Sequence, residues 1–271
     1  MIALPNLQNI HLVVCDCDGT ILNDDKKIDS DLFAVKKELE KKGIALTLAS
    51  GRNHFLMHSI LNDLDIQLPY ITDNGGNLYQ GNERLINNVL PNSRTEEIAK
   101  YLYAVKMPFL VYTDQIVFSY LSTGHLSVFI ERLKGKMQIA AYDPAEGCRN
   151  ISSFKITIDS TDVLNMQMIE THFRDAYPDV NFNRSEGDLY TITSMYATKG
   201  IALEQLSKIM EIPLSQIMAF GDNHNDVCML KTAGFGVAVQ NAEKDVYEAA
   251  DALCGSNNQN GVSRYLREHF L

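Results

Sequence analysis

Short apolar runs alternate with amphipathic stretches at both ends of the chain. Residues 12–14 are wholly apolar, as in a buried strand, whereas Leu32, Val35 and Leu39 recur at the spacing of one helix face. The predicted strands cover residues 11–15, 44–49, 70–72, 217–220 and 236–239. The predicted helices cover residues 31–42, 53–64, 199–210, 226–232, 243–250 and 262–270. Strands separated by helices indicate an α/β fold, here a doubly wound, mostly parallel Rossmann-like sheet.

The middle of the chain has a different pattern, in which several strands follow one another with few helices between them. Gly81 and Asn82 predict a hairpin turn, and residues 113–115 predict another. The predicted strands cover residues 78–80, 84–87, 109–112, 116–120, 154–158, 180–183 and 189–193, and the predicted helices residues 95–105 and 162–176. This order is typical of an antiparallel α+β module. We therefore expect a core of residues 1–80 and 190–271, with an inserted α+β domain at residues 81–189.

The composition is that of a globular protein long enough for two domains. The 271 residues are 45% hydrophobic and 21% charged. We expect neither a membrane segment nor a signal peptide, because no apolar run approaches about 20 residues and no basic segment precedes one at the start. Five irregularly spaced cysteines favour reduced thiols and a cytoplasmic location. The net charge of −10 disfavours nucleic acid as a partner.

Polar residues lie at the ends of four predicted elements of the core. Asp16 and Asp18 follow the first strand, Ser50 follows the second, Lys199 opens a helix, and residues 221–226 follow a later strand. Each cluster alone fits an ordinary turn or helix cap. Ligands of parallel sheets bind at the carboxyl ends of the strands, so four clusters at this edge indicate one site. Paired carboxylates there suit a divalent cation and leave one oxygen to attack an electrophile.

Together these residues resemble the motif set of the haloacid dehalogenase superfamily of phosphoryl-transfer enzymes. Residues 16–20 match its Asp-x-Asp-Gly-Thr motif, Ser50 the second-motif hydroxyl, Lys199 the third-motif lysine, and residues 221–226 the pattern Gly-Asp-x-x-Asn-Asp. About 150 residues separate Ser50 from Lys199, which resembles the members whose cap domain is inserted between the second and third motifs. Further matches, at residues 73–75 and 236–242, resemble the Cof-type subgroup.

The resemblance implies a site for Mg²⁺ and a phosphorylated enzyme. Asp16 would attack phosphorus to form an aspartyl-phosphate, and Asp18 would protonate the leaving oxygen and then activate water. The implied Mg²⁺ ligands are the Asp16 carboxylate, the Asp18 backbone carbonyl and Asp222. Cations are needed because like charges about 4 Å apart repel by roughly 4 kcal/mol per pair. The implied phosphate ligands are Ser50, Gly51, Lys199 and Asn225; Asn74 either joins them or caps the third strand, and Asp226 orients Lys199 or a water on the metal.

The implied function is a Mg²⁺-dependent phosphatase of small phosphorylated metabolites, first sugar phosphates and then phosphorylated cofactors. The alternatives are a sugar phosphomutase, which shares these motifs, and a non-catalytic phosphate-binding regulator. Substrate choice would lie in the cap, where His125, Arg149, Lys155, Arg184 and Tyr190 carry no distinctive signal. The oligomeric state is open, and a monomer would suffice.

Several nearby residues are open to a simpler interpretation. Cys15 and Cys17 replace aliphatic residues usual in the family, and we expect inert buried thiols; the alternative is that oxidation of Cys17 disturbs the site. Arg52 is expected to be a surface arginine rather than an anion ligand. His54 and His58, four residues apart, are expected on a solvated helix face rather than in a metal pair.

Overall fold

The computed structural model describes residues 7–113, 115–121, 124–135, 137–147, 152–160, 163–184 and 188–271. The chain divides into two compact units. The first unit contains residues 1–86 and 198–271, and the second contains residues 87–197.

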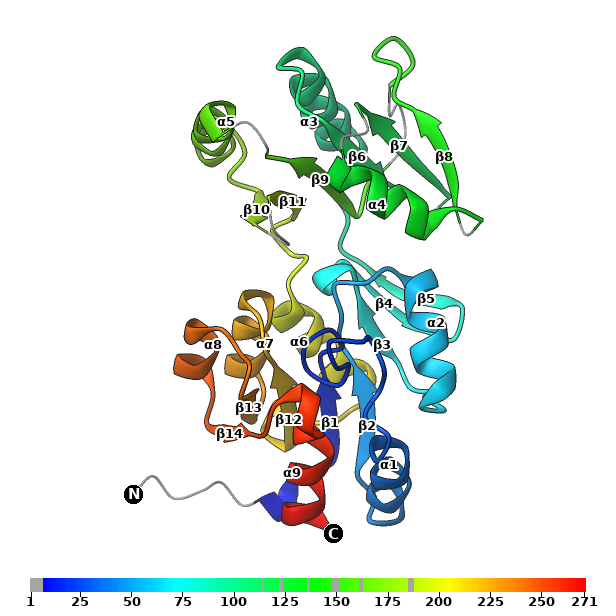
Figure 1. Cartoon of the computed structure of the whole chain (residues 1–271), viewed down its shortest axis with the longest axis vertical. Helices are drawn as coiled ribbons and strands as arrows, with labels where there is room; N and C mark the ends of the chain where they lie inside the picture. The colour runs from blue at the N-terminus through cyan, green and yellow to red at the C-terminus, as the bar shows by residue number, and fades with distance from the viewer. Residues whose placement is uncertain are drawn as a thin grey trace. The chain divides into compact units, whose positions relative to one another are not determined.

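A five-stranded parallel sheet is the centre of the first unit (Figure 1). Its strands follow the order β14 (Ala252–Cys254), β13 (Phe235–Val239), β12 (Ile217–Gly221), β1 (Leu12–Cys15) and β2 (Ala45–Leu48). Every neighbouring pair is parallel. The carboxyl ends of β1, β2 and β12 therefore lie at one edge of the sheet, and this edge carries the site described below.

Helices cover both faces of this sheet because apolar side chains alternate along its strands. Val13 and Cys15 pack with the helices α1 (Leu32–Lys41), α2 (His54–Asp63) and α9 (Gly261–Phe270). Leu12 and Val14 pack on the opposite side with α6 (Lys199–Ile209), α7 (Val227–Thr232) and α8 (Lys244–Ala249). All four strand side chains are fully buried, and such burial contributes about 1.5–3 kcal/mol for each large aliphatic residue. The predicted doubly wound α/β fold is confirmed.

A small three-stranded sheet of β3 (Tyr70–Thr72), β4 (Asn77–Gln80) and β5 (Glu83–Asn87) also lies in this part of the chain. β3 pairs antiparallel with β4, and an isolated parallel bridge joins Ile71 to Ala49 beyond β2. β3 was expected in the main sheet, but among the described strands it belongs to this separate small sheet.

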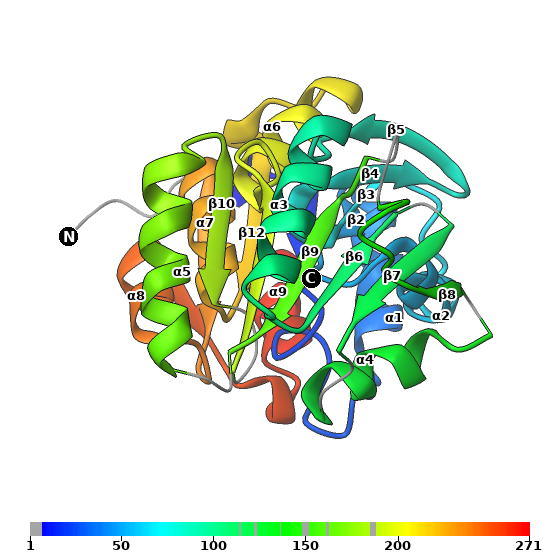
Figure 2. The ribbon, with the colours of Figure 1, turned by 90° about the horizontal axis from the view of Figure 1, so that it is seen from above.

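The second unit is built on a six-stranded sheet with helices on both faces. Its strands follow the order β10 (Val180–Arg184), β11 (Leu189–Ser194), β9 (Lys155–Asp159), β6 (Phe109–Tyr112), β7 (Ile116–Tyr120) and β8 (Gln138–Ala141). Figure 2 shows this sheet from β10 at the left to β8 at the right. The helices α3 (Asn92–Ala104) and α5 (Val163–Ala176) pack on one face and α4 (Gly124–Leu133) on the other.

Among the α-helices and strands that the structure describes, three were not predicted: α4, β8 and β14. β14 has three residues, too few to show a period, and α4 opens with a glycine, a poor helix former. The second unit was expected to be antiparallel, but β7 and β8 run parallel. The expected boundary at residue 190 falls inside β11, which pairs with β9 and β10, so the structural boundary lies after Ala197. Asp114, in one predicted turn, lies outside the described residues.

Among the residues that the structure describes, no helix is both long and apolar enough to cross a membrane.

Candidate active site

Asp16 lies immediately beyond β1, at the carboxyl edge of the parallel sheet. Its backbone N–H donates to the carbonyl of Phe220 over 2.9 Å, which continues the pairing of β1 with β12. Its side chain is almost completely buried. Ser50 lies beyond β2 and is tied in the same way, since its N–H donates to the carbonyl of Ile71 over 3.0 Å. The sheet register thus fixes both residues at one edge.

Lys199 forms a buried ion pair with two carboxylates. Its Nζ lies 2.6 Å from Oδ1 of Asp16 and 2.5 Å from Oδ1 of Asp226. Lys199 is 1% exposed and Asp226 is fully buried. Burial lowers the pKa of Lys199, but the charges and hydrogen bonds of the two carboxylates outweigh it and raise this pKa above its usual value. The lysine is therefore a permanent cation beside Asp16.

Helix α6 begins at this lysine because Thr198 caps it. The Thr198 hydroxyl accepts a hydrogen bond from the N–H of Ile201 over 3.2 Å, as an N-cap residue does. A lysine at a helix start opposes the helix dipole, so the two carboxylates offset an otherwise unfavourable position.

Asp226 anchors the loop after β12. Its Oδ2 accepts hydrogen bonds from the N–H groups of Asp222 and Asn223, each over 3.1 Å, while its Oδ1 faces Lys199. A Cβ on Gly221 would lie 2.4 Å from the Cβ of Asp226, so the loop needs a glycine there. Both oxygens of Asp226 are already engaged, which makes it a positioning residue rather than a free ligand.

Asp16, Asp222 and Asp226 form a cluster in which one carboxylate oxygen of each lies within 4.8 Å of the others. Burial and the charge of Asp226 raise the pKa of Asp222 to about 6, against the hydrogen bond from Thr20 and the charge of Lys199. Burial also raises the pKa of Asp16 well above its usual value. Closely placed oxygen donors of this kind fit a hard divalent cation. Since Asp226 is engaged, Asp16 and Asp222 are the two carboxylates that fit as its ligands.

Gly19 makes the close approach of Asp222 possible. Its φ is +86°, and a Cβ at this position would lie 2.3 Å from Oδ2 of Asp222. The hydroxyl of Thr20 donates to Oδ1 of Asp222 over 2.8 Å, and Asn241 donates to the Gly19 carbonyl over 2.8 Å. Thr20 and Asn241 were not among the predicted site residues, although both lie in the quoted motifs.

Asp18 points its carboxylate toward two cations instead of the carboxylate cluster. Nε and Nη2 of Arg52 lie 2.6 and 2.7 Å from its two oxygens, and Nζ of Lys26 lies 2.9 Å from Oδ1. Burial raises the pKa of Asp18, but the hydrogen bonds and charges of Arg52 and Lys26 outweigh it and lower this pKa to about 2. The expectation of a surface Arg52 was therefore wrong, because its side chain is 25% exposed and forms a fork-shaped pair with Asp18.

Gly51, Asn74 and Asn225 meet beside Ser50. Nδ2 of Asn225 donates to Oδ1 of Asn74 over 2.7 Å, and a Cβ on Gly51 would lie 2.7 Å from that same oxygen. Asn74 has a positive φ of 58°, and the buried Ser50 hydroxyl accepts a hydrogen bond from the N–H of Arg52 over 3.1 Å. The structure thus brings these predicted phosphate ligands together.

A family model described as haloacid dehalogenase-like hydrolase matches residues 13–266. The chain belongs to the haloacid dehalogenase-like hydrolases. The resemblance drawn from the motifs is confirmed, and the geometry above is that of a member of this family.

Relatives of this haloacid dehalogenase-like hydrolase match it over nearly their whole length. The HMP-PP phosphatase of Serratia proteamaculans is 28% identical and covers 96% of this chain and 95% of its own. The 5-amino-6-(5-phospho-D-ribitylamino)uracil phosphatase YwtE of Bacillus subtilis is 27% identical, with 94% and 96% covered. A haloacid dehalogenase-like hydrolase from Bacteroides thetaiotaomicron has a similar structure, with a TM-score of 0.82 at 26% identity over 96% of this chain and 100% of that one.

Two cysteines of this hydrolase flank Asp16. Cys15 and Cys17 are fully buried in the cluster that contains Met57, and Sγ of Cys17 lies 4.0 Å from the Met57 sulfur. Burial raises the pKa of both thiols. This environment favours the expected inert thiols. The alternative is a redox role of Cys17. If peroxide inhibits a Cys17→Ser variant as strongly as it inhibits the parent, that role is excluded.

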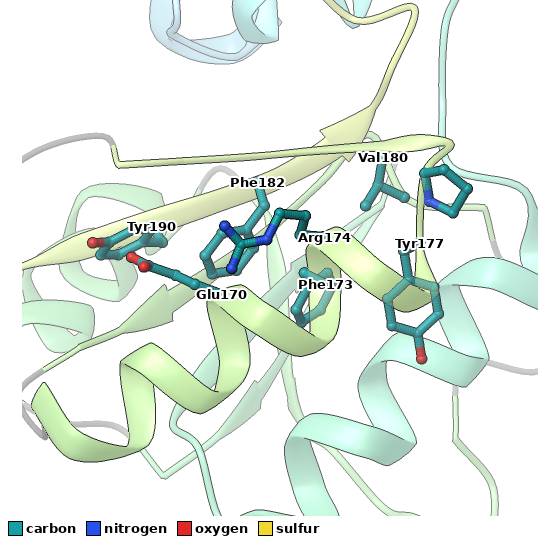
Figure 3. A pocket seen from close by; sticks show the side chains of 8 residues that line it. Glu170, Phe173, Arg174, Tyr177, Val180, Phe182 and Tyr190 are labelled. Atoms are coloured by element: carbon teal, nitrogen blue, oxygen red, sulfur yellow. The ribbon is translucent and has the colours of Figure 1, made fainter.

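The second unit of the hydrolase contains a pocket of about 430 Å³ between α5 and the strands β10 and β11. Figure 3 shows Glu170 directed toward Tyr190 and Arg174 beside Phe182. Tyr190 is one of the cap residues named from the sequence. Of the others, Arg149 lies outside the described residues. His125 lies beside Asp159, Lys155 beside the ring of Tyr112, and Arg184 beside Asp188.

Proposed function

We propose that this chain is a Mg²⁺-dependent phosphatase that hydrolyses small phosphorylated metabolites. Its membership of the haloacid dehalogenase-like hydrolases and its phosphatase relatives support a phosphoric monoester hydrolase. One observation carries the proposal: Lys199 lies buried between Asp16 and Asp226, with Asp222 beside them. A binding module would have no need of a carboxylate held this way at the end of a strand.

Charge explains why the site needs this arrangement. A phosphate monoester carries about two negative charges, and each would repel the Asp16 carboxylate by roughly 4 kcal/mol at about 4 Å. Lys199 compensates part of this repulsion from 2.6 Å. Mg²⁺ bound by Asp16, the Asp18 backbone carbonyl and Asp222 would neutralise further charge on the phosphoryl group.

The chain's own residues account for both chemical steps. An oxygen of Asp16 attacks phosphorus, the ester P–O bond breaks, and the leaving oxygen takes a proton from Asp18. Water then gives a proton to Asp18 and attacks phosphorus, which releases phosphate and restores Asp16. The pair with Arg52 favours the ionised form of Asp18 that the second step needs, so the first step requires Asp18 to leave Arg52.

Other residues hold the phosphoryl oxygens and the lysine. The hydroxyl of Ser50, the backbone N–H of Gly51 and the amide of Asn225 would donate to the phosphoryl oxygens. Asn74 positions Asn225 through their 2.7 Å hydrogen bond. Asp226 orients Lys199 toward Asp16.

The substrate class is a small phosphate ester. The two relatives are named as phosphatases of 5-amino-6-(5-phospho-D-ribitylamino)uracil and of HMP-PP, which supports a small phosphorylated metabolite as the substrate. The net charge of −10 argues against nucleic acid. The four cysteines that the structure describes are free thiols, which supports a reducing compartment such as the cytoplasm.

The test is release of inorganic phosphate from sugar phosphates, nucleotides and phosphorylated cofactors, with Mg²⁺ and with a chelator, beside an Asp16→Asn variant. Mg²⁺-dependent release that this variant lacks would establish the phosphatase. Conversion of one sugar phosphate into its isomer without phosphate release would instead establish a phosphomutase. Binding of phosphate without turnover of any compound would favour a regulator.

A further inference from the structure

His54 and His58 face each other on the first turns of α2. Their Nε2 atoms lie 3.0 Å apart, and the ring centroids are 4.3 Å apart at an interplanar angle of 85°. The helix backbone is firmly held here, because Asn53 caps it by accepting a hydrogen bond from the N–H of Leu56 over 3.0 Å. Met57, the residue before His58, is fully buried in the core.

A hydrogen-bond chain determines which nitrogen of His54 carries the proton. The Tyr70 hydroxyl donates to the carbonyl of Gly81 over 3.0 Å, since a carbonyl can only accept. With its hydrogen used, the hydroxyl oxygen can only accept from Nδ1 of His54, which lies 2.8 Å away. A neutral imidazole has one N–H, so Nε2 of His54 presents its lone pair to His58.

Stacking fixes the orientation of the same ring. His54 lies against Tyr79 with a centroid distance of 4.2 Å and an interplanar angle of 21°. A metal-ligating histidine usually donates the N–H of one ring nitrogen to a fixed oxygen and binds the metal through its other, unprotonated nitrogen.

The spacing of the two nitrogens also matches a chelate. Zinc–imidazole bonds are about 2.0–2.1 Å long, and two of them at roughly 95–110° span about 3.0–3.4 Å. The observed 3.0 Å lies at the lower end of this span. Two histidines at i and i+4 on one helix face are a known way of holding zinc.

We propose that His54 and His58 form a chelating site for a transition cation of the Zn²⁺, Cu²⁺ or Ni²⁺ type, independent of the carboxylate cluster. Imidazole nitrogen suits these cations, whereas Mg²⁺ prefers oxygen, so the two sites select different metals. Binding moves the hydrogen of His58 from Nε2 to Nδ1 and releases no net proton. Water completes the coordination. The alternative is the solvated pair expected from the sequence.

The test uses the full chain without a histidine tag, with one equivalent of Cu²⁺ added in the presence of excess Mg²⁺. Electron paramagnetic resonance should show coupling to two imidazole nitrogens, which an oxygen-only site cannot produce. His58→Ala should lose one nitrogen coupling while the helix is retained, because alanine is a better helix former than histidine. His11→Ala, at an exposed histidine, is the matched control and should keep both couplings.

A Tyr70→Phe variant tests the proton assignment. It keeps both imidazoles but removes the acceptor of His54 Nδ1, so Zn²⁺ affinity measured by calorimetry should fall by about 10- to 100-fold, as for other outer-shell partners of metal ligands. Circular dichroism checks that the His58→Ala and Tyr70→Phe variants remain folded. No nitrogen coupling in the parent, or two couplings retained in His58→Ala, would overturn the proposal.

Discussion

Replacing Lys199 by methionine would remove the positive charge between Asp16 and Asp226 while keeping a chain of similar length. In the parent, Nζ lies 2.6 and 2.5 Å from the two carboxylates, and carboxylate oxygens of the cluster lie within 4.8 Å of one another. At an effective dielectric constant near 20, two unit charges 4.8 Å apart repel by about 3.5 kcal/mol. Removing one partner of a buried ion pair typically costs about 3–5 kcal/mol. We expect Lys199→Met to lower the free energy of unfolding by about 3–5 kcal/mol in the absence of Mg²⁺.

The assay is urea unfolding with a chelator, followed by circular dichroism, on the parent, Lys199→Met, Asp226→Asn and the double variant. Because the two groups are in direct contact, the cycle should give a coupling energy of about 1–3 kcal/mol. Lys208→Met is the matched control: Lys208 is exposed in the last turn of the same helix and should contribute less than about 1 kcal/mol. A loss in Lys199→Met no larger than in this control, or strictly additive effects, would refute the reasoning.

Three further predictions concern the same edge of the sheet. Asp16→Asn should lower phosphate release by at least about a thousandfold with an unchanged circular dichroism spectrum, as loss of a nucleophile does; substantial residual turnover would contradict its role. Gly19→Ala would place a Cβ 2.3 Å from Oδ2 of Asp222, so the Mg²⁺ concentration for half-maximal activity should rise at least about tenfold by titration; an unchanged titration would remove Asp222 from the ligand set. With a chelator present, Arg52→Ala should destabilise the protein in full above about pH 4 and progressively less as pH falls toward 2, because the pKa of Asp18 is lowered to about 2 and the stability from its pair is lost as pH falls through that value. Thermal unfolding of both proteins from pH 6 to 3 would show the difference narrowing, whereas a constant difference would exclude this pair as its cause.

The parallel sheet could be predicted because its strands and helices have clear periods. Residues 12–14 form an unbroken apolar run, and Leu32, Val35 and Leu39 mark one helix face; all of these are fully buried. β14 could not be found in this way, because three residues establish no alternation. β11 was predicted as a strand, but its place in the second unit depends on its pairing with β9 and β10, which no local pattern encodes.

The candidate site was predictable in its residues but not in its pairings. The ends of β1, β2 and β12 had to meet once the sheet was parallel, so Asp16, Ser50 and Asp222 could be placed together. The pair of Asp18 with Arg52 spans 34 positions and depends on the turn at Gly19, whose φ is +86°. A local pattern therefore could not show that this arginine has a carboxylate partner.

The contacts of the histidine pair could not be predicted from a local pattern either. The spacing of His54 and His58 is visible in the chain, but the proton on His54 is set by Tyr70 and Gly81, which come from β3 and from the turn after β4. Those contacts exist only in the folded sheet.

The order of the strands has a consequence for synthesis on the ribosome. β1 lies between β2, about 30 residues later, and β12, about 200 residues later. At typical elongation rates of about 5–20 residues per second, one edge of β1 waits roughly 10–40 s for its partner. During this interval the nascent chain exposes an unpaired apolar strand, which is the kind of edge that associates with other chains. Residues 87–197, which form the second compact unit, are synthesised during this interval, so β1 gains its second neighbour only after that whole unit has been made.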